Sequence, residues 1–162
     1  MTKHQNMEPR SASLSQLTMT QVIMPEQTNP FGNTHGGDLV KLMDNAAGVV
    51  AIRHSSAPNM LTAGIDNLVF KRTIRVGDLI FCNAEIIYTG RTSIGLYVTV
   101  TVEKVKIRVT KPAVEGYWFM VAADKNGKPT PVPPLKIENK EQELKRNDAL
   151  NRLKRLKEVS KN

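Results

Sequence analysis

The residues best suited to chemistry lie where a loop meets a helix. Residues 25–37 (PEQTNPFGNTHGG) are rich in proline, glycine and asparagine and predict an ordered loop, and a helix is expected from residue 36 onward. Gly36 and Gly37 therefore lie at a helix N-terminus, where backbone N–H groups have no partner within the helix. Such groups can bind an anion, or an oxygen that becomes negatively charged in a transition state.

Two polar side chains accompany this junction. Asp44 follows about two turns into a mostly apolar helix, where a carboxylate can act as a base or as a nucleophile. Asn29, in the preceding loop, can orient a water molecule or a carbonyl group. A Gly-Gly pair or a helical aspartate alone is more often structural. Together, an N–H donor, an acid and an amide meet the roles that acyl transfer requires.

The helix itself is predicted at residues 36–54 from apolar residues three and four positions apart. These apolar residues are Leu39, Leu42, Met43, Ala46, Ala47 and Val50. The second half is apolar nearly all round, so we expect the helix to be buried. One line of residues, Gly37, Lys41, Asp44 and Gly48, breaks the apolar surface and is a candidate ligand-facing stripe.

The other internal elements are predicted to be strands with short connections. They are expected at residues 14–24, 60–70, 78–88, 93–102 and 117–123. The alternation along residues 93–102 changes parity near Glu103 and Lys104 and continues on odd numbers to Val109, so we expect a bulge or break there. Without a repeating strand-helix-strand order, the fold class is α+β with an antiparallel sheet, and this sheet is expected to wrap the single buried helix.

The chain divides into a domain and its appendages. Residues 1–11 predict a flexible N-terminal arm, residues 12–127 a single domain, residues 128–137 a proline-rich linker, and residues 138–162 a charged C-terminal helix. This last helix, with leucines among charges up to residue 159, is expected to be amphipathic and mostly solvated.

Charge and composition argue against several classes of protein. The net charge is +8, but residues 136–162 hold nine Lys or Arg against five Asp or Glu, which is +4 of that total. Aromatic residues make up only 5%, which leaves little for stacking on nucleic-acid bases. No apolar run approaches the roughly 20 residues of a membrane span, and the N-terminus has no secretory signal. We therefore expect no nucleic-acid partner, no membrane partner and a cytoplasmic location.

Other chemistries lack their signatures. The sequence has no nucleophile elbow, phosphate-binding loop or dinucleotide-binding glycine motif. His4, His35 and His54 are not spaced as metal ligands, so no metal is expected. The single cysteine, Cys82, lies in an apolar segment and is interpreted as a small core residue.

Residues 29–47 (NPFGNTHGGDLVKLMDNAA) resemble the signature of the hotdog-fold acyl-CoA thioesterases, in the acyl-CoA hydrolase subfamily. The runs at residues 62–70, 75–78 and 89–93 follow in the order and at the intervals typical of that subfamily. The resemblance covers about residues 12–125 and implies a hotdog fold of five or six strands around one long central helix. Two positions depart from the usual pattern, Thr73 in place of proline and His35 in place of a bulkier residue.

The resemblance also implies an activity and a site. The activity is hydrolysis of fatty acyl-CoA to a free fatty acid and coenzyme A, with no cofactor. The catalytic pair falls on Asn29 of one subunit and Asp44 of the other, the oxyanion donor on the Gly36 N–H with Gly37 beside it, and a further implicated threonine on Thr62. Asp44 either activates a water molecule or attacks directly to give an anhydride.

The substrate and assembly follow from the same resemblance. Coenzyme A carries phosphates, so Lys71, Arg72, Arg91 and Ser93 are candidates to bind its nucleotide end, although each is more often a plain surface residue. An active site shared between subunits requires at least a dimer, and family members often assemble as hexamers, trimers of dimers.

Three alternatives stay open. A hotdog hydratase or dehydratase uses a histidine near the helix start, and His35 is present, but the D-x-N-P-x-H pattern is absent. A non-catalytic acyl-CoA-binding or regulatory module would not need both Asn29 and Asp44. A nucleic-acid binder would depend on the basic tail, and purely electrostatic binding would disappear at physiological salt.

Overall fold

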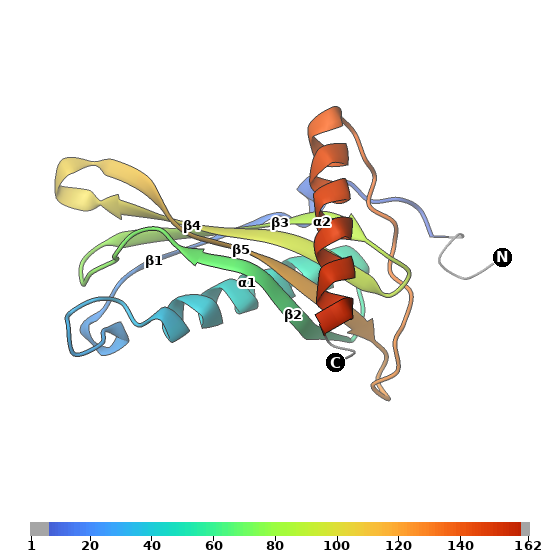
Figure 1. The fold of residues 1–162 in the computed structure, drawn as a ribbon, viewed down its shortest axis with the longest axis horizontal. Coiled ribbons are helices and arrows are strands. Elements are labelled where there is room, and N and C mark those ends of the chain that lie inside the picture. The colour runs from blue at the N-terminus through green and yellow to red at the C-terminus, as the bar shows by residue number, and fades with distance from the viewer. Residues whose placement is uncertain (1–6, 160–162) are drawn as a thin grey trace.

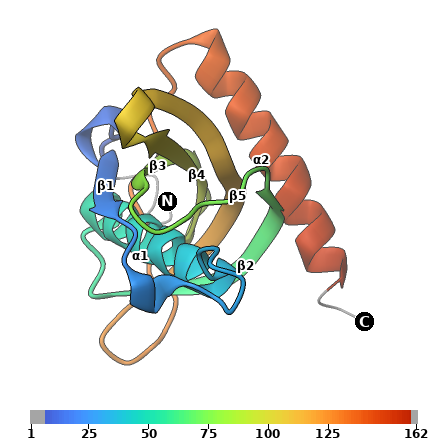
Figure 2. The ribbon, with the colours of Figure 1, turned by 90° about the vertical axis from the view of Figure 1, so that its left-hand side faces the viewer.

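The computed structural model describes residues 7–159 as a curved sheet around one helix. The first six residues of the predicted arm and the last three of the predicted tail lie outside this range. The elements are β1 (Leu17–Val22), α1 (Gly36–Ser55), β2 (Asn59–Phe70), β3 (Leu79–Thr89), β4 (Ser93–Lys104), β5 (Val109–Ala123) and α2 (Lys140–Val159). The sheet is antiparallel with strand order β1-β3-β4-β5-β2, and it wraps α1 while α2 lies on its outer side (Figures 1 and 2). The expected α+β architecture is confirmed, with five strands.

The core lies between the concave face of the sheet and α1. The strongest alternation in the sequence is confirmed, because Ile94, Leu96, Val98 and Val100 are all fully buried. The buried face of α1 carries most of the apolar residues expected there, including Met43. Burial of this much aliphatic surface is the main force that holds the helix inside the sheet.

Cys82 lies in this core as expected. Its side chain is fully buried on β3. Burial disfavours the thiolate and raises the pKa of the Cys82 thiol to about 12. The thiol is therefore an inert packing group.

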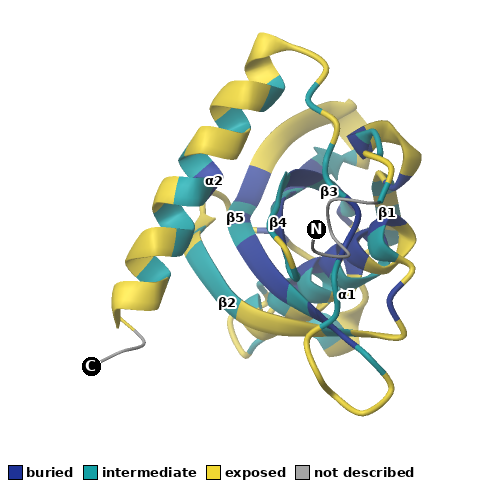
Figure 3. Cartoon of the chain, turned by 90° about the vertical axis from the view of Figure 1, so that its right-hand side faces the viewer, coloured by how far each residue is buried: buried dark blue, intermediate teal, exposed yellow. Residues whose placement is uncertain are grey.

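Helix α2 packs against the convex face of the sheet along a narrow stripe (Figure 3). Ala149 is buried there, next to Phe119 and with Leu153 and Leu156 beside it. Most other α2 residues are exposed, which confirms a mostly solvated amphipathic helix. The helix begins two residues later than predicted because Asn139 caps it, its Oδ1 accepting the N–H of Gln142 at 2.9 Å.

Charged contacts fix α2 to the sheet as well. Arg152 donates to Asp66 of β2 and to Asp148 of α2, both at 2.8 Å. Its guanidinium also lies 3.8 Å from the centre of the Tyr117 ring on β5. These contacts join the C-terminal helix to β2, the strand that carries Thr62.

The first strand is shorter than predicted. The strand expected at residues 14–24 forms only over β1, because Ala12–Leu14 make a short 3-10 helix. The backbone N–H of Ser15 and its hydroxyl both donate to the Ala12 carbonyl, which turns the chain before it can pair. Local hydrogen bonds of this kind compete with strand pairing.

The break expected near Glu103 and Lys104 is confirmed, because β4 ends at Lys104 and the chain reverses there. Val105–Ile107 form a 3-10 turn, and Arg108 adopts the left-handed conformation with φ 52°. β5 then begins at Val109, eight residues before the predicted start. Residues 109–116 were not predicted as part of the strand because the first part of β5 is exposed and mostly polar. An apolar run appears only where the strand is buried.

Strand β2 lies at the edge of the sheet and contains a bulge that determines which way Thr62 points. It pairs with β5, and within the described chain no strand pairs with its other edge. The register shifts between Thr62, opposite Met120, and Gly64, opposite Phe119. Because the extra residue reverses the side-chain alternation, Thr62 faces α1 on the inside, whereas Gly64 faces Leu156 of α2 on the outside.

The end of α1 contains a buried histidine that predicts a pH dependence of stability. His54 donates from Nε2 to the carbonyl oxygen of Pro133 at 3.1 Å, and its Nδ1 is buried without a partner among the described residues. Burial, the largest cause, lowers the pKa of His54 below its ordinary value of 6.5, and the nearby Arg10 lowers it further. The contribution of neutral His54 to the free energy of unfolding is therefore fully present above pH 6.5. It is lost as the pH falls below that value, because His54 is protonated more readily in the unfolded chain than in the folded chain.

Denaturant unfolding on both sides of that pH tests this prediction. His54→Gln should have a shallower decline of unfolding free energy with acid than the wild type. Ile52→Ala, a change without a titratable group at an exposed position near the same end of α1, should keep the wild-type decline. Equal declines in all three proteins would contradict the assignment to His54.

Candidate active site

The carboxylate of Asp44 is held by donors from two strands. Its Oδ1 accepts a hydrogen bond from the Thr62 hydroxyl at 2.7 Å and another from the Trp118 indole N–H at 3.0 Å. Asp44 is half-buried on α1, Thr62 lies on β2 and Trp118 on β5. Two donors on one oxygen fix the orientation of the side chain and leave the other oxygen available to a ligand.

Sequence reasoning missed Trp118. It lies within the predicted strand at residues 117–123, where it was counted only as one apolar residue among several. It is fully buried, and a buried indole needs a partner for its N–H. The single tryptophan of the chain was the available signal, but nothing in its spacing pointed to Asp44.

The N-terminus of α1 presents one free donor where the sequence suggested two. His35 is the N-cap residue, and its Nδ1 accepts the N–H of Gly37 at 3.1 Å. The Gly36 N–H makes no hydrogen bond within the described residues, so it is the donor available to an oxyanion. Because the Nδ1 atom of His35 accepts this capping hydrogen bond, it is not available as a catalytic base of the kind that a hydratase would need.

Asn29 closes its own loop through its side-chain oxygen. Its Oδ1 accepts the backbone N–H groups of Phe31 at 3.0 Å and Asn33 at 3.2 Å. The Nδ2 group makes no hydrogen bond within the described residues. The loop therefore fixes the side chain and leaves an amide donor free for a ligand.

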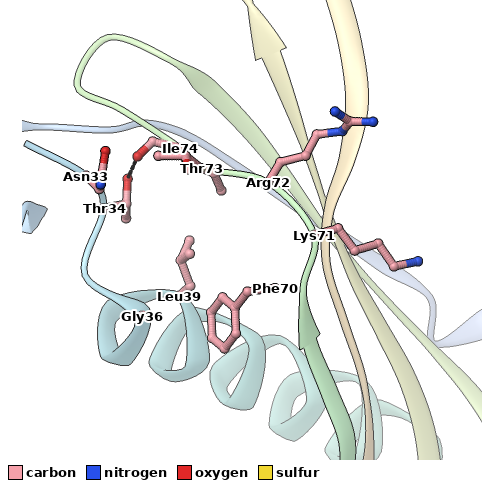
Figure 4. A pocket seen from close by; sticks show the side chains of 9 residues that line it. All are labelled: Asn33, Thr34, Gly36, Leu39, Phe70, Lys71, Arg72, Thr73 and Ile74. Carbon is pink, nitrogen blue, oxygen red and sulfur yellow. Dashed lines mark hydrogen bonds between the residues drawn. The ribbon is translucent and has the colours of Figure 1, made fainter.

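A hollow of about 390 Å³ lies next to the free N–H of Gly36 (Figure 4). It is lined by Asn33, Thr34, Gly36, Leu39, Phe70, Lys71, Arg72, Thr73 and Ile74. The Thr34 hydroxyl donates to the Ile74 carbonyl oxygen at 2.9 Å, which ties the loop before α1 to the segment after β2. The hollow can hold part of a ligand whose reacting carbonyl approaches Gly36.

The four candidates for the nucleotide end of a substrate do not lie together in one chain. Lys71 and Arg72 line the hollow, and Figure 4 shows their charged ends pointing away from α1. Lys71 pairs with Glu115 at 2.6 Å, and this contact lowers the pKa of the Glu115 carboxyl. Arg91 and Ser93 lie at the other end of the strands, about seven residues along β4 or roughly 23 Å away.

The donor and the acid are also separated within one chain. Gly36 and Asp44 are eight residues apart on α1, which corresponds to about 12 Å along the helix axis. A reacting carbonyl must lie about 3 Å from the oxyanion donor and close to the base or nucleophile. Gly36 and Asp44 of the same chain therefore cannot act on the same carbonyl group.

Known proteins resemble this chain over most of its length. A model of the thioesterase superfamily matches residues 31–109. The acyl-CoA thioester hydrolase YciA of Salmonella typhimurium is 32% identical over 121 residues, covering 73% of this chain and 90% of the relative. This chain belongs to the hotdog-fold acyl-CoA thioester hydrolase family. The family resemblance of residues 29–47 is thereby confirmed.

Longer relatives and solved structures extend the likeness. The cytosolic acyl coenzyme A thioester hydrolase of Rattus norvegicus is 34% identical over 143 residues, which are 87% of this chain but only 37% of that protein. An apo-hexameric acyl-CoA thioesterase has 29% identity and a TM-score of 0.88, covering 94% of this chain and 97% of that one. The acyl-CoA hydrolase of Staphylococcus aureus, solved with butyryl coenzyme A, coenzyme A and coenzyme A disulfide, has 28% identity and a TM-score of 0.84, covering 93% and 92%. The hotdog fold is thus shared over nearly the whole chain.

Two further properties concern residues 7–159 only. No cluster of three or more His, Cys, Asp or Glu side chains among them is arranged to hold a metal ion. Neither helix in that range is long and apolar enough to span a membrane.

Thr62 offers a test of how Asp44 is held. Thr62→Val removes one of the two hydrogen bonds to Asp44, and we expect kcat for thioester hydrolysis to fall about 10- to 100-fold, since a hydrogen bond to a charged group contributes about 1.5–3 kcal/mol. Thr62→Ser keeps the hydroxyl and should stay within a few-fold of the wild type. Equal activity of the valine and serine variants would show that the hydroxyl is not needed.

Proposed function

We propose that this protein hydrolyses acyl-CoA thioesters to a free carboxylic acid and coenzyme A. The carrying observation is the Asp44 carboxylate, oriented by Thr62 and Trp118 on a helix whose first N–H is free. The two relatives described above are named acyl-CoA thioester hydrolases, and they support the same reaction. The substrate carries the chemistry itself, so the proposal includes no cofactor.

The reaction assigns a separate role to each group. The Gly36 N–H and the positive end of the α1 dipole polarise the thioester carbonyl and stabilise its developing negative charge. Asn29, through its free Nδ2, orients water or the carbonyl. Asp44 either removes a proton from the attacking water or attacks the carbonyl to form an anhydride that water then cleaves. A single turnover in isotopically labelled water distinguishes these routes, since label enters the Asp44 carboxylate only by the anhydride route.

The test of this function is release of free thiol from a panel of acyl-CoAs of increasing chain length. We expect release from at least part of the panel, and the same panel gives the chain-length preference. No release from any acyl-CoA would favour a binding or regulatory module instead. The rat relative is named cytosolic, which supports a cytoplasmic location as part of the proposal.

The proposed active site is shared between two subunits. The 12 Å along α1 between Gly36 and Asp44 support a site made from two chains, and the edge of β2, unpaired within residues 7–159, offers a surface where a second sheet can join. An antiparallel pair of α1 helices would bring Gly36 and Asn29 of one subunit to Asp44 of the other. Similar structures are described as hexameric, which supports assembly of three such dimers.

Such an assembly also bears on the nucleotide end of the substrate. Lys71 and Arg72 lie near Gly36, whereas Arg91 and Ser93 lie at the far end of the strands. Their separation of roughly 23 Å within one chain favours a nucleotide site to which two subunits each contribute one pair. All four residues are therefore proposed to bind the nucleotide end of coenzyme A in the hexamer.

Mixing two inactive variants tests the shared site. Asp44→Asn removes the acid, and Asn29→Asp removes the amide donor while it keeps the oxygen that closes the loop. In a mixed dimer one of the two sites has both wild-type residues, so co-expression should restore about a quarter of wild-type activity. Absence of any restoration, with mixed dimers present by mass spectrometry, would contradict a site made from two chains.

A further inference from the structure

The hairpin between β4 and β5 projects beyond the rest of the sheet. Residues 104–111, here named the tip, include the 3-10 turn Val105–Ile107 and the left-handed Arg108. In Figure 1 this hairpin extends past the neighbouring strands at the end of the molecule where α1 begins. The tip is therefore accessible to a macromolecule or surface that approaches that end.

The tip carries strong positive charge. Lys104, Lys106, Arg108 and Lys111 contribute four positive charges to residues 103–111 and Glu103 contributes one negative charge, which gives +3. Lys104 is neutralised by the buried Asp78. Among residues 7–159, no acid lies within ion-pair distance of the other three cations, so their charge is free to attract an anionic partner.

The same tip exposes aliphatic side chains between these cations. Ile107 is 68% exposed, Val105 49% and Val109 38%. They form walls of two open hollows, one of about 520 Å³ beside Val76 and one of about 400 Å³ beside Arg72. Exposing these aliphatic side chains to water is unfavourable, and contact with an apolar surface would remove that cost.

We propose that the tip docks on an anionic lipid bilayer. Ile107, Val105 and Val109 would enter the boundary between headgroups and acyl chains, while Lys106, Arg108 and Lys111 would contact lipid phosphates. This combination of a small apolar area with basic residues is what binds proteins to anionic membrane surfaces. The expectation of no membrane partner rested on the lack of a spanning segment, and a peripheral contact needs none.

The tip lies next to the candidate active site, so a bilayer bound at the tip would be close to the site where substrate reacts. The hollow beside the tip and the hollow beside Gly36 share Lys71, Arg72 and Thr73. A bilayer held at the tip would lie next to the route toward the free N–H. Because long-chain acyl thioesters partition into bilayers, such docking would shorten the transfer of substrate from lipid to enzyme.

Sedimentation with vesicles tests the proposal without using catalysis, so its result is separate from that of the proposed function. The full-length oligomer is mixed with vesicles of phosphatidylcholine alone or with added phosphatidylglycerol. We expect binding only to the anionic vesicles, weakened by salt. K106E combined with R108E should weaken binding by at least about 25-fold, since each basic residue near the surface contributes about fivefold. No binding of the wild type overturns the proposal.

Two further variants separate the lipid surface from other occupants. K140E combined with K154E changes the net charge equally on exposed residues of α2 and should bind like the wild type. Ile107→Ser should weaken vesicle binding about tenfold while binding to heparin, a soluble polyanion, stays unchanged. Equal loss in the α2 control, no effect of Ile107→Ser, or a smaller oligomer in light scattering of the tip variants would each overturn docking on lipid. Unchanged circular dichroism would exclude misfolding as the cause of lost binding.

Discussion

Replacing Asp44 with asparagine is expected to lower kcat for acyl-CoA hydrolysis by about 10²- to 10⁴-fold, the usual contribution of a general base. The amide keeps an oxygen that can accept from Thr62 and Trp118, so the contacts that hold the side chain survive. What disappears is the negative charge that removes a proton from water or attacks the carbonyl. A loss in kcat with an unchanged unfolding midpoint would therefore measure chemistry alone.

The measurement is thiol release at saturating acyl-CoA, compared with a control on the same helix. Asp38→Asn removes a carboxylate from the first turn of α1 and should retain most of the activity. Near-normal turnover by Asp44→Asn would exclude Asp44 as base or nucleophile. An equal loss in both variants would point to a general effect of charge on α1.

Replacing Trp118 with alanine is expected to lower the free energy of unfolding by about 3–5 kcal/mol, the range for deleting a large buried aromatic side chain. The indole is fully buried on β5, and its N–H donates to Asp44 of α1. The substitution leaves a cavity between the helix and the sheet and removes one restraint on the carboxylate. Denaturant unfolding followed by circular dichroism gives the change in stability.

Trp118→Phe separates packing from positioning. It keeps an aromatic ring in the core and removes the indole N–H, so most of the stability should remain while kcat falls by about tenfold through weaker orientation of Asp44. KM should change little, because the indole acts through the carboxylate. Wild-type kcat in Trp118→Phe would show that the hydrogen bond from Trp118 is dispensable for catalysis.

Much of the fold could be predicted from the sequence because its strongest signals are local. The three- and four-residue spacing in residues 36–54 predicted α1 to within one residue of its observed end. The alternation in residues 93–102 predicted both β4 and its buried face. Signals weakened where burial did not shape composition, and for that reason the exposed start of β5 was missed, although the break near Glu103 and Lys104 was predicted.

The candidate site was predicted as a set of residue types and was completed by tertiary contacts. The loop and its Gly-Gly pair indicated a helix N-terminus, yet only the structure showed that His35 occupies the N–H of Gly37 and leaves that of Gly36 free. Capping depends on a side-chain rotamer, which residue spacing does not determine. The same limit hid the contact between Trp118 and Asp44, which are 74 positions apart.

By itself, the sequence determined which groups are available: a carboxylate on an apolar helix, an amide in a fixed loop and a helix N-terminus after Gly36. Tertiary structure decided which of them meet. A bulge between Thr62 and Gly64 turns the hydroxyl of Thr62 toward α1, and the 12 Å along α1 keep Asp44 away from Gly36 of its own chain. Hydrophobic periodicity records which face of an element is buried, whereas distances across the sheet depend on register, bulges and helix length, which a single sequence does not record.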